Sequence, residues 1–226
     1  MARRPIFSSG ETEVNPVKVN EIEFNWFSGF SRSQCIKSIR SLHAEAKKML
    51  SFENILEVST CSENELGIKL SAFNLRLEWD KKIITVEAAY QGSKVFEKGG
   101  PYHDIYEMDS YRAKTDERIK NSGKIIEFNF FDYHWSAEPK SAFYNWIYIL
   151  SLSQNKKLSD ELEKFDAFSD IKFNPKNSLN CQAYSCALYV FLKRNNLLEK
   201  VLNREGDYLS WIGKGYVPED LLFEEK

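Results

Sequence analysis

Three side chains near the middle of the sequence could together perform acid–base or nucleophilic chemistry. Glu87, Gln91 and Lys94 are spaced at i, i+4 and i+7, so a helix over residues 85–96 would place an acid, an amide and an amine on one face. Thr85 can cap that helix, because its hydroxyl can accept a hydrogen bond from a first-turn N–H group. A glutamate in a first helical turn is also favoured simply by the positive end of the helix dipole. The spacing alone therefore leaves a catalytic role and a purely helix-stabilising role open for Glu87.

The elements that would position these side chains follow from the hydrophobic periodicity of the chain. Serines that can cap a helix precede apolar residues at helical spacing in residues 31–50. A polar turn between two short apolar runs predicts a hairpin just before the helix of Glu87. The expected strands are residues 21–30, 54–59, 70–77, 82–86 and 124–131. The expected helices are residues 31–50, 85–96, a charged surface helix within 105–121, 136–155, 158–165, 181–195 and one or two short helices within 197–226, with Trp211 as an anchor.

The composition and the pattern of elements predict one α+β domain that is mainly helical, with small hairpin and sheet elements. Of the 226 residues, 42% are hydrophobic and 28% are charged, as in an ordinary soluble globular protein. Residues 1–18 are polar and contain Pro5 and Pro16, so we expect a flexible N-terminal arm followed by a single domain over residues 19–226. The net charge of −2 supplies no global basic field, so any nucleic acid would be bound locally.

The sequence contains no motif that is typical of a metal or cofactor site. HExxH, P-loop, GxGxxG and GxSxG patterns are absent, which argues against metalloprotease, nucleotide kinase, Rossmann and serine hydrolase functions in their usual forms. The four cysteines form no CxxC pair, so free thiols in a reducing cytoplasm are expected rather than zinc. No apolar run approaches the roughly 18 residues that a membrane span needs, and the N-terminus does not read as a secretory signal. We therefore expect a cytoplasmic protein that uses no cofactor.

Four sequence blocks occur in an order that resembles the NADAR (YbiA-like) domain family. SAFN at residues 71–74 and the later VEAAYQGSKVF are similar to an S-x-F cluster followed by E-x-x-x-Q-x-x-K-F on a helix. Trp135 then precedes a long helix that ends in LSQNKKL, where the family has F-x-Q-N-x-x-L. Finally, FSDIKFNPKNSLNCQA carries an acidic loop residue, Asp170, and an asparagine, Asn180, before the last core helix. The resemblance spans about residues 70–195.

The resemblance implies a hydrolase that removes ADP-ribose from modified guanine by cleaving the N-glycosidic bond. EFNWFSGFSRSQCIKSIRSLH, QGSKVFEKGGP and DAFSDIKFNPK are similar to a subgroup encoded beside DarT-type toxins, which transfer ADP-ribose from NAD to guanine in DNA. The implied role is that of an antitoxin that reverses this modification. Two blocks depart from the wider family: FNPK at residues 173–176 replaces Trp-Gly-(Asp/Asn)-Gly, and NCQA at residues 180–183 replaces Asn-x-Leu-Gly.

The resemblance also implies roles for single residues. Cleavage at the anomeric carbon develops positive charge on the sugar, which a nearby carboxylate can stabilise, or that carboxylate can take a proton from water. Glu87 is the expected catalytic acid or base, and Asp170 a second acid from the opposite wall. Lys94 could bind a phosphate, or could attack an opened ribose as a deprotonated amine. Trp135 could be a platform for the base or the sugar, or a core residue. The expected substrate-binding residues are Ser71, Phe73, Asn74, Gln91, Trp135 and Asn180, of which Phe73 could equally be core.

Two other functions are compatible with the same sequence. One is a non-catalytic module that binds ADP-ribose or a related nucleotide. The other is an antitoxin that acts by direct contact with a DarT-type toxin. The expected partners are accordingly DNA that carries guanine-linked ADP-ribose, ADP-ribose itself and, in the last case, the toxin. The sequence leaves open whether Glu87 or Lys94 carries the chemistry.

Overall fold

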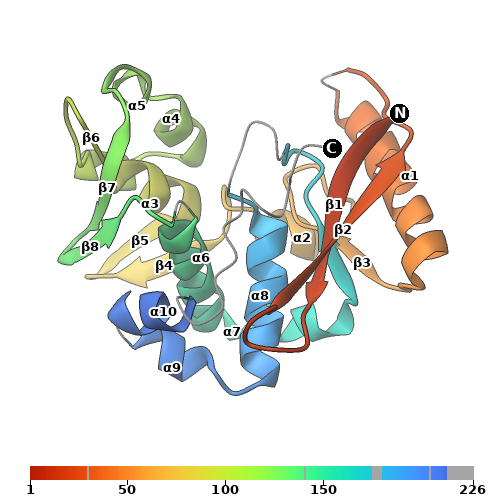
Figure 1. Ribbon diagram of the computed structural model, residues 1–226. Helices are drawn as coiled ribbons and strands as arrows, with labels where there is room; N and C mark the ends of the chain where they lie inside the picture. The colour runs from red at the N-terminus through yellow and green to blue at the C-terminus, as the bar shows by residue number, and fades with distance from the viewer. Residues whose placement is uncertain (30, 140, 175–179, 204, 213–226) are drawn as a thin grey trace.

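A four-stranded sheet forms one side of the molecule, and its two longest strands come from the N-terminus (Figure 1). Strands β1 (Ala2–Ser9) and β2 (Val17–Phe24) pair antiparallel along their whole lengths. Strand β1 also pairs antiparallel with β9 (Ala167–Ser169), which runs parallel to β3 (Ile55–Glu57). The strand order is therefore β2-β1-β9-β3. The computed structural model describes residues 1–29, 31–139, 141–174, 180–203 and 205–212.

The expectation of a flexible arm over residues 1–18 is wrong, because β1 lies inside this sheet. Ile6 and Phe7 are 0% and 1% exposed and pack on opposite faces of the strand. Helix α1 (Arg32–Leu50) covers one face and helix α8 (Gln182–Arg194) covers the other (Figure 1). Burying a large aliphatic or aromatic side chain contributes about 1.5–3 kcal/mol. Ile6 and Phe7 therefore hold the N-terminal strand to the domain. The sequence did not indicate this, because most of the residues around them are polar.

The helices expected over residues 31–50 and 181–195 are both confirmed. Ser31 caps α1, because its hydroxyl accepts a hydrogen bond from the Gln34 N–H group at 3.4 Å. The buried side of α1 includes Ile39 and Leu42, which face the sheet. Helix α8 is buried on most sides, as its apolar composition predicted.

The other half of the molecule begins with the expected hairpin, but its first strand covers Arg76–Trp79 and not residues 70–77, because residues 71–74 form a turn. Strands β4 (Arg76–Trp79) and β5 (Lys82–Thr85) pair antiparallel and lead directly into helix α3 (Val86–Gly92). The hydroxyl of Thr85 accepts a hydrogen bond from the Ala88 N–H group at 3.2 Å, so the predicted cap is confirmed. The hairpin therefore fixes where α3 starts, and with it the position of the first-turn glutamate.

The helix expected over residues 85–96 ends at Gly92, so Lys94 lies on a strand and not on the helix face. A Cβ atom added at Gly92 would lie 2.6 Å from the ring of Tyr106, so this glycine allows a close approach that ends the helix. The chain then enters β6 (Lys94–Phe96), where Lys94 pairs with Phe128. Pairing with β7 stabilises this segment more than one further helical turn would. Local periodicity does not reveal such a pairing, because its partner is distant in the sequence.

A second sheet and helix α6 (Ala142–Gln154) complete the core of this half. Strands β6, β7 (Ile125–Phe130) and β8 (Tyr133–Ser136) form an antiparallel sheet in the order β6-β7-β8. The helix expected from residue 136 starts at Ala142 instead, because β8 occupies residues 133–136. The largest buried side chains here are mostly aromatic: Phe130, Trp135, Phe143, Trp146 and Tyr148.

The Gln-Asn pair of the LSQNKKL block joins α6 to the hairpin. The Gln154 side chain accepts a hydrogen bond from the Glu78 N–H group at 2.8 Å and donates one to its carbonyl at 3.1 Å. Asn155 donates to the Arg76 carbonyl at 2.7 Å. These side chains satisfy the backbone groups of β4 on its side away from β5. The role of this block in the structure is therefore to position the hairpin and, through it, α3.

The remaining elements are short, and the domain is mainly helical as expected. Helix accounts for 46% and strand for 22%, in a single α+β domain with three small sheets. Strands β8 and β9 were not foreseen, and the expected surface helix within residues 105–121 is split into three pieces. No helix formed by the residues described above is long and apolar enough to cross a membrane. The further elements are α2 (Glu65–Lys69), η1 (His103–Glu107), α4 (Ser110–Thr115), α5 (Glu117–Asn121), α7 (Lys156–Ser159), η2 (Asp160–Lys164), α9 (Leu198–Leu202) and α10 (Glu205–Ile212).

Candidate functional site

Glu87, Gln91 and Lys94 form a continuous hydrogen-bonded chain, although Lys94 is not on the helix. The Lys94 amine donates to Gln91 Oε1 at 2.7 Å, and Gln91 Nε2 donates to Glu87 Oε1 at 2.9 Å. The amide between them thus has one orientation, with its oxygen toward the amine and its nitrogen toward the carboxylate. All three side chains are buried, with 7–8% exposure. The structure therefore brings together the acid, the amide and the amine that the sequence singled out.

The surroundings of Lys94 favour its neutral form more than water does. Burial lowers the pKa of the Lys94 amine to about 8, and the positive charge of Lys114 acts in the same direction, while Glu87 opposes both. The amine also lies 4.5 Å from the ring centroid of Tyr90. A lysine in water has a pKa of about 10.4. Around pH 8, therefore, much of Lys94 is a free amine, the form that can act as a nucleophile.

The SAFN cluster lies against the first turn of α3. The Glu87 N–H group donates to the Ala72 carbonyl, and the Val86 N–H group donates to the Leu75 carbonyl, both at 2.9 Å. Residues 71–75 therefore run beside the catalytic candidate Glu87. The adjacency that the sequence predicted between the cluster and the helix is produced by these two backbone hydrogen bonds.

The polar side chains of this cluster are hydrogen-bonded to each other. Asn74 Nδ2 donates to Ser71 Oγ at 3.0 Å and to the Ile68 carbonyl at 2.9 Å, and Ser71 also donates to that carbonyl. Ser71 is 1% exposed, whereas Asn74 is exposed. Phe73 is half-buried, and the Lys114 amine lies 5.2 Å from its ring centroid. Asn74 and Phe73 are thus the members of the cluster that a ligand can touch without rearrangement.

Asp170 is a buried carboxylate in the turn that follows β9. Its side chain is 7% exposed, and Oδ1 accepts a hydrogen bond from the Lys172 N–H group at 3.0 Å. Burial raises the pKa of Asp170 to about 6, although hydrogen bonds from this backbone group and from the Gln182 side chain act in the opposite direction. A carboxyl with such a pKa carries a proton in part of the molecules near neutral pH and can act as a general acid.

Gln182, at the start of α8, connects Asp170 to the SAFN cluster. Its side chain donates to Asp170, and its Oε1 accepts a hydrogen bond from the Ala72 N–H group at 2.7 Å. The same Ala72 residue accepts from Glu87 on its carbonyl side. Ala72 therefore connects the two acidic residues: its N–H group is bonded to Gln182, which also bonds Asp170, and its carbonyl is bonded to the backbone of Glu87. Sequence reasoning noted Gln182 only as a departure from the family pattern and missed this role.

Two tyrosines, Tyr90 of α3 and Tyr144 of α6, interact with residues of this site. Asn180 Nδ2 donates to the Tyr90 hydroxyl at 2.6 Å, which joins the chain before α8 to α3. Burial, together with the negative charges of Glu87 and Asp170, raises the pKa of Tyr144 well above its ordinary value. Both carboxylates therefore lie close enough to Tyr144 for their charges to act on the same phenol. Neither tyrosine was predicted, since aromatic residues on a helix are ordinarily core.

Trp135 does not belong to this group of side chains. It is 0% exposed and packs in the aromatic core, with ring centroids 5.0 Å from Trp146 and 5.8 Å from Phe143. Of the two roles that the sequence left open, the structure places Trp135 in the core, and no face of its indole is available to a base. Residues 175–179 of the loop before Asn180, including two positions of the FNPK block, lie outside the described residues.

Behind Asp170 lies Glu57 of β3, a second buried carboxyl that sequence reasoning missed. It is 3% exposed, its Oε1 accepts from the Ile171 N–H group at 2.9 Å, and its Oε2 accepts from the Ser169 hydroxyl. Burial and the charge of Asp170 raise the pKa of Glu57 to about 8. The Ser169 hydroxyl also lies 2.7 Å from Nε2 of His43, which lines a cleft of about 350 Å³. Glu57 and Asp170 come from distant parts of the chain, so no spacing pattern could pair them.

The raised pKa of Glu57 predicts a pH-dependent stability. The folded state binds this proton more tightly than the unfolded state, so the contribution is fully present below the ordinary glutamate pKa and is lost as the pH rises through about 8. In this window the free energy of unfolding of the wild type should fall, relative to that of Glu57→Gln, by up to about 1.4 kcal/mol per pH unit. Denaturant titrations from pH 5 to 9 measure it, with Glu53→Gln, an exposed neighbour, as the control. Parallel profiles for the wild type and Glu57→Gln would contradict the assignment.

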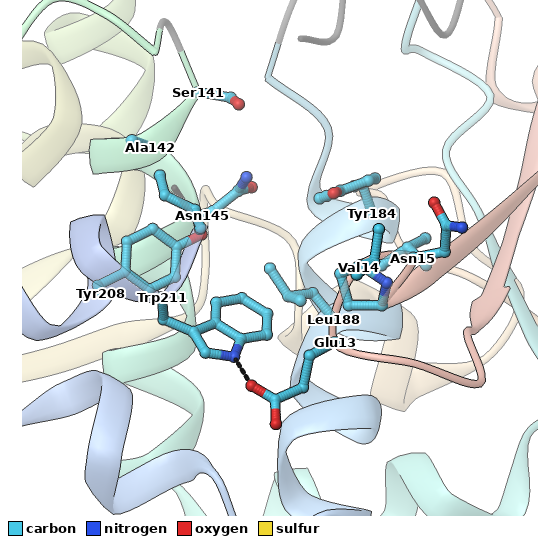
Figure 2. A pocket seen from close by; sticks show the side chains of 13 residues that line it. Glu13, Val14, Asn15, Ser141, Ala142, Asn145, Tyr184, Leu188, Tyr208 and Trp211 are labelled. Carbon is cyan, nitrogen blue, oxygen red and sulfur yellow. Dashed lines mark hydrogen bonds between the residues drawn. The ribbon is translucent and has the colours of Figure 1, made fainter. Parts of the chain in front are cut away.

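A separate small cavity of about 60 Å³ lies between the β1–β2 connection and helices α6, α8 and α10 (Figure 2). Trp211 of α10 borders it, and its indole N–H group donates to Glu13 Oε2 at 2.9 Å. This bond ties the C-terminal helix to the N-terminal hairpin, so the predicted anchoring role of Trp211 is confirmed. Its lining contains neither Glu87 nor Lys94 nor Asp170, which separates it from the site described above.

The fold and the site define an α+β domain with a buried amine and three buried carboxyls, and the pKa values of the amine, Asp170 and Glu57 are shifted, as is typical of an enzyme's reaction centre. A family model described as the DarT1-associated NADAR antitoxin matches residues 2–220, and the chain belongs to this family. It is a NADAR antitoxin associated with the DarT1 toxin, and NADAR proteins are generally ADP-ribose hydrolases. No curated protein matches the chain. The family match starts at residue 2, in agreement with the structural role of β1.

Proposed function

We propose that the protein removes ADP-ribose from guanine bases of DNA and thereby reverses the modification made by the DarT1 toxin. The observation that carries this proposal is the buried chain of Glu87, Gln91 and Lys94, which is connected to Asp170 through Ala72 and Gln182. Two carboxyls with separate environments and one amine of lowered pKa supply an acid, a base and a nucleophile. The family membership supports a hydrolase of ADP-ribose linkages.

Hydrolysis of the N-glycosidic bond needs charge stabilisation and two proton transfers. As the bond to guanine breaks, the ribose ring develops positive charge, which the Glu87 carboxylate stabilises. Glu87 can also take the proton from the attacking water, which adds to the anomeric carbon either directly or after Lys94 has displaced the guanine. The leaving guanine nitrogen must gain a proton, and Asp170, which retains a proton more readily than an ordinary aspartate, is suited to donate it. The products are ADP-ribose and unmodified guanine.

The remaining side chains of the site would bind the substrate. Amide and hydroxyl groups of Asn74, Gln91 and Asn180 can exchange hydrogen bonds with ribose hydroxyls and phosphates, and Ser71 supports Asn74 from behind. Phe73 and Lys114 lie together at the edge of the site and present a ring and a cation to the ligand. Lys94 either binds a phosphate or attacks the sugar; the two roles make different predictions, which are taken up below.

The experiment that tests the proposal is incubation of the protein with ADP-ribosylated single-stranded DNA, followed by measurement of released ADP-ribose. We expect release and recovery of unmodified DNA. Saturable binding of ADP-ribose without any release would instead indicate a binding module. Stoichiometric co-purification with the toxin, unaffected by Glu87→Gln, would indicate an antitoxin that acts by contact. Either of these results without turnover would refute the hydrolase.

A further inference from the structure

Two aromatic side chains that follow β2 are exposed on a well-anchored backbone. Trp26 and Phe27 are 41% and 39% exposed. The N–H groups of Asn25 and Phe27 donate to the hydroxyls of Ser41 and Ser38 of α1, at 3.1 and 3.0 Å. These bonds fix the segment along the side of α1, so the two rings are held in place rather than carried on a loose loop. Exposed and immobilised aromatic rings are typical of surfaces that bind flat ligands.

An arginine lies against the first of these rings. The guanidinium carbon of Arg4 is 5.4 Å from the ring centroid of Trp26, and Nη1 donates to the Arg3 carbonyl at 2.8 Å. Arg4 Nε is buried and has no hydrogen-bond partner among the described residues. The neighbouring Arg3 is paired with Glu23 at 3.4 Å, whereas Arg4 forms no ion pair within the described part of the chain. Apart from the attraction of the nearby Asp170 charge, the Arg4 guanidinium is therefore open to an anionic ligand.

The strand register places this arginine beside the candidate site. In the antiparallel pairing of β1 with β9, Ile6 lies opposite Ser169. Because the strands are antiparallel, the residues before Ile6 lie beside those after Ser169, so Arg4 is close to the turn that contains Asp170. The negative charge of Asp170 accordingly acts on the Arg4 guanidinium. Trp26, Phe27 and Arg4 thus form one surface, here called the Trp26 surface, next to one wall of the site.

We propose that the Trp26 surface binds the single-stranded DNA that flanks the ADP-ribosylated guanine. This inference rests on the proposed function, and it adds the location at which the rest of the substrate binds. Flanking bases stack on Trp26 and Phe27, and a backbone phosphate pairs with Arg4. Lys37, exposed and one turn before Ser41 on α1, supplies a second cation on the same side. A local surface of this kind agrees with a net charge of −2, which gives no global attraction for DNA.

The test compares two substrates that differ only in flanking DNA. One is ADP-ribosylated guanosine, and the other is a single-stranded oligonucleotide with one ADP-ribosylated guanine. Trp26→Ala should lower kcat/KM for the oligonucleotide about tenfold, because one stacking contact is lost, and should leave the nucleoside unaffected. Arg4→Gln should act in the same direction and should weaken the salt dependence of oligonucleotide turnover. Matched controls are Met49→Ala, an exposed apolar residue at the other end of α1, and Arg194→Gln at the end of α8.

Direct binding separates failure of this inference from failure of the proposed function. Fluorescence anisotropy with an unmodified single-stranded oligonucleotide needs no turnover. Weaker binding by Trp26→Ala than by Met49→Ala supports the Trp26 surface even if the wild type hydrolyses neither substrate. Equal binding by the two variants, or an equal loss of turnover on the nucleoside and the oligonucleotide, overturns it. Wild-type inactivity on both substrates refutes the hydrolase independently of this outcome.

Discussion

Replacing Glu87 by glutamine is expected to reduce the release of ADP-ribose from modified DNA by at least about a hundredfold. The substitution removes the charge that stabilises the developing sugar cation and the base that accepts a proton from water. It keeps the shape of the side chain, and the new amide oxygen can still accept the hydrogen bond from Gln91 Nε2. The fold and the binding of ADP-ribose should therefore persist. The measurement is single-turnover release, accompanied by calorimetric binding of ADP-ribose and a thermal melt.

A matched control for this substitution is Glu107→Gln. Glu107 is an exposed glutamate that forms an ion pair with Lys82 at 2.9 Å, and it is not part of the hydrogen-bonded chain of Glu87, Gln91 and Lys94. It should release ADP-ribose at the wild-type rate. If Glu87→Gln also keeps that rate, then Glu87 serves only to stabilise the first turn of α3, which is the structural alternative that the sequence left open. A loss of ADP-ribose binding together with activity would assign Glu87 to substrate binding rather than to catalysis.

The part of the site that is local in sequence could be predicted, and the part assembled from distant segments could not. Glu87 and Gln91 lie one helical turn apart, so their contact follows from helix geometry once Thr85 is recognised as the cap. The contact between Lys94 and Gln91 was expected from a helix that continues to residue 96, and that helix does not extend so far. The helix ends at Gly92, and the lysine returns to the amide from a strand that pairs with β7.

Long-range contacts account for most of what sequence reasoning missed. Gln182 reaches Ala72 across 110 positions of the chain, and Glu57 meets the residues around Asp170 only because β3 and β9 are parallel neighbours. Such contacts depend on strand order, which no periodicity encodes. The N-terminal strand was missed for a related reason, since Ile6 and Phe7 give a strong signal only once β9 and α8 supply the surfaces that bury them.

Family resemblance selected positions on which composition alone gave no information, and their roles in the reaction stay predictions. Asp170 and Asn180 were expected from the order of motifs. Asn180 is hydrogen-bonded to Tyr90 of α3, and the charge of Asp170 acts on Tyr144 of α6. Trp135 was expected from the same motifs and is a core residue. A tryptophan can occupy a motif position because it packs from β8 onto Phe143 and Trp146 of α6, and only burial distinguishes this from ligand stacking.

The second large effect is expected at Lys94, where two substitutions separate nucleophilic from electrostatic action. Lys94→Arg retains a positive charge that can bind phosphate but removes the amine that could attack a sugar carbon. Lys94→Met removes both. If Lys94 acts as the nucleophile, both variants should lose turnover by a similar factor, at least about a hundredfold. Lys114→Arg is the control, because this exposed lysine lies at the edge of the site and its charge is preserved.

We expect the nucleophilic result, because burial lowers the pKa of Lys94 to about 8. Opening of the ribose breaks the C1′–O4′ bond, places a proton on O4′ and leaves C1′ as an imine of the guanine nitrogen. The neutral Lys94 amine adds to C1′, and the bond to guanine breaks as the guanine nitrogen takes a proton, which leaves a lysine imine. Water hydrolyses this imine and releases ADP-ribose and the free amine. Reduction with borohydride during turnover should trap this adduct, with the mass of ADP-ribose added at Lys94. At pH 7 about a tenth of such an amine is neutral, so turnover should rise as the pH increases toward 8. An active Lys94→Arg variant, with no trapped adduct and turnover that falls above pH 8, would assign the lysine to phosphate binding as a cation.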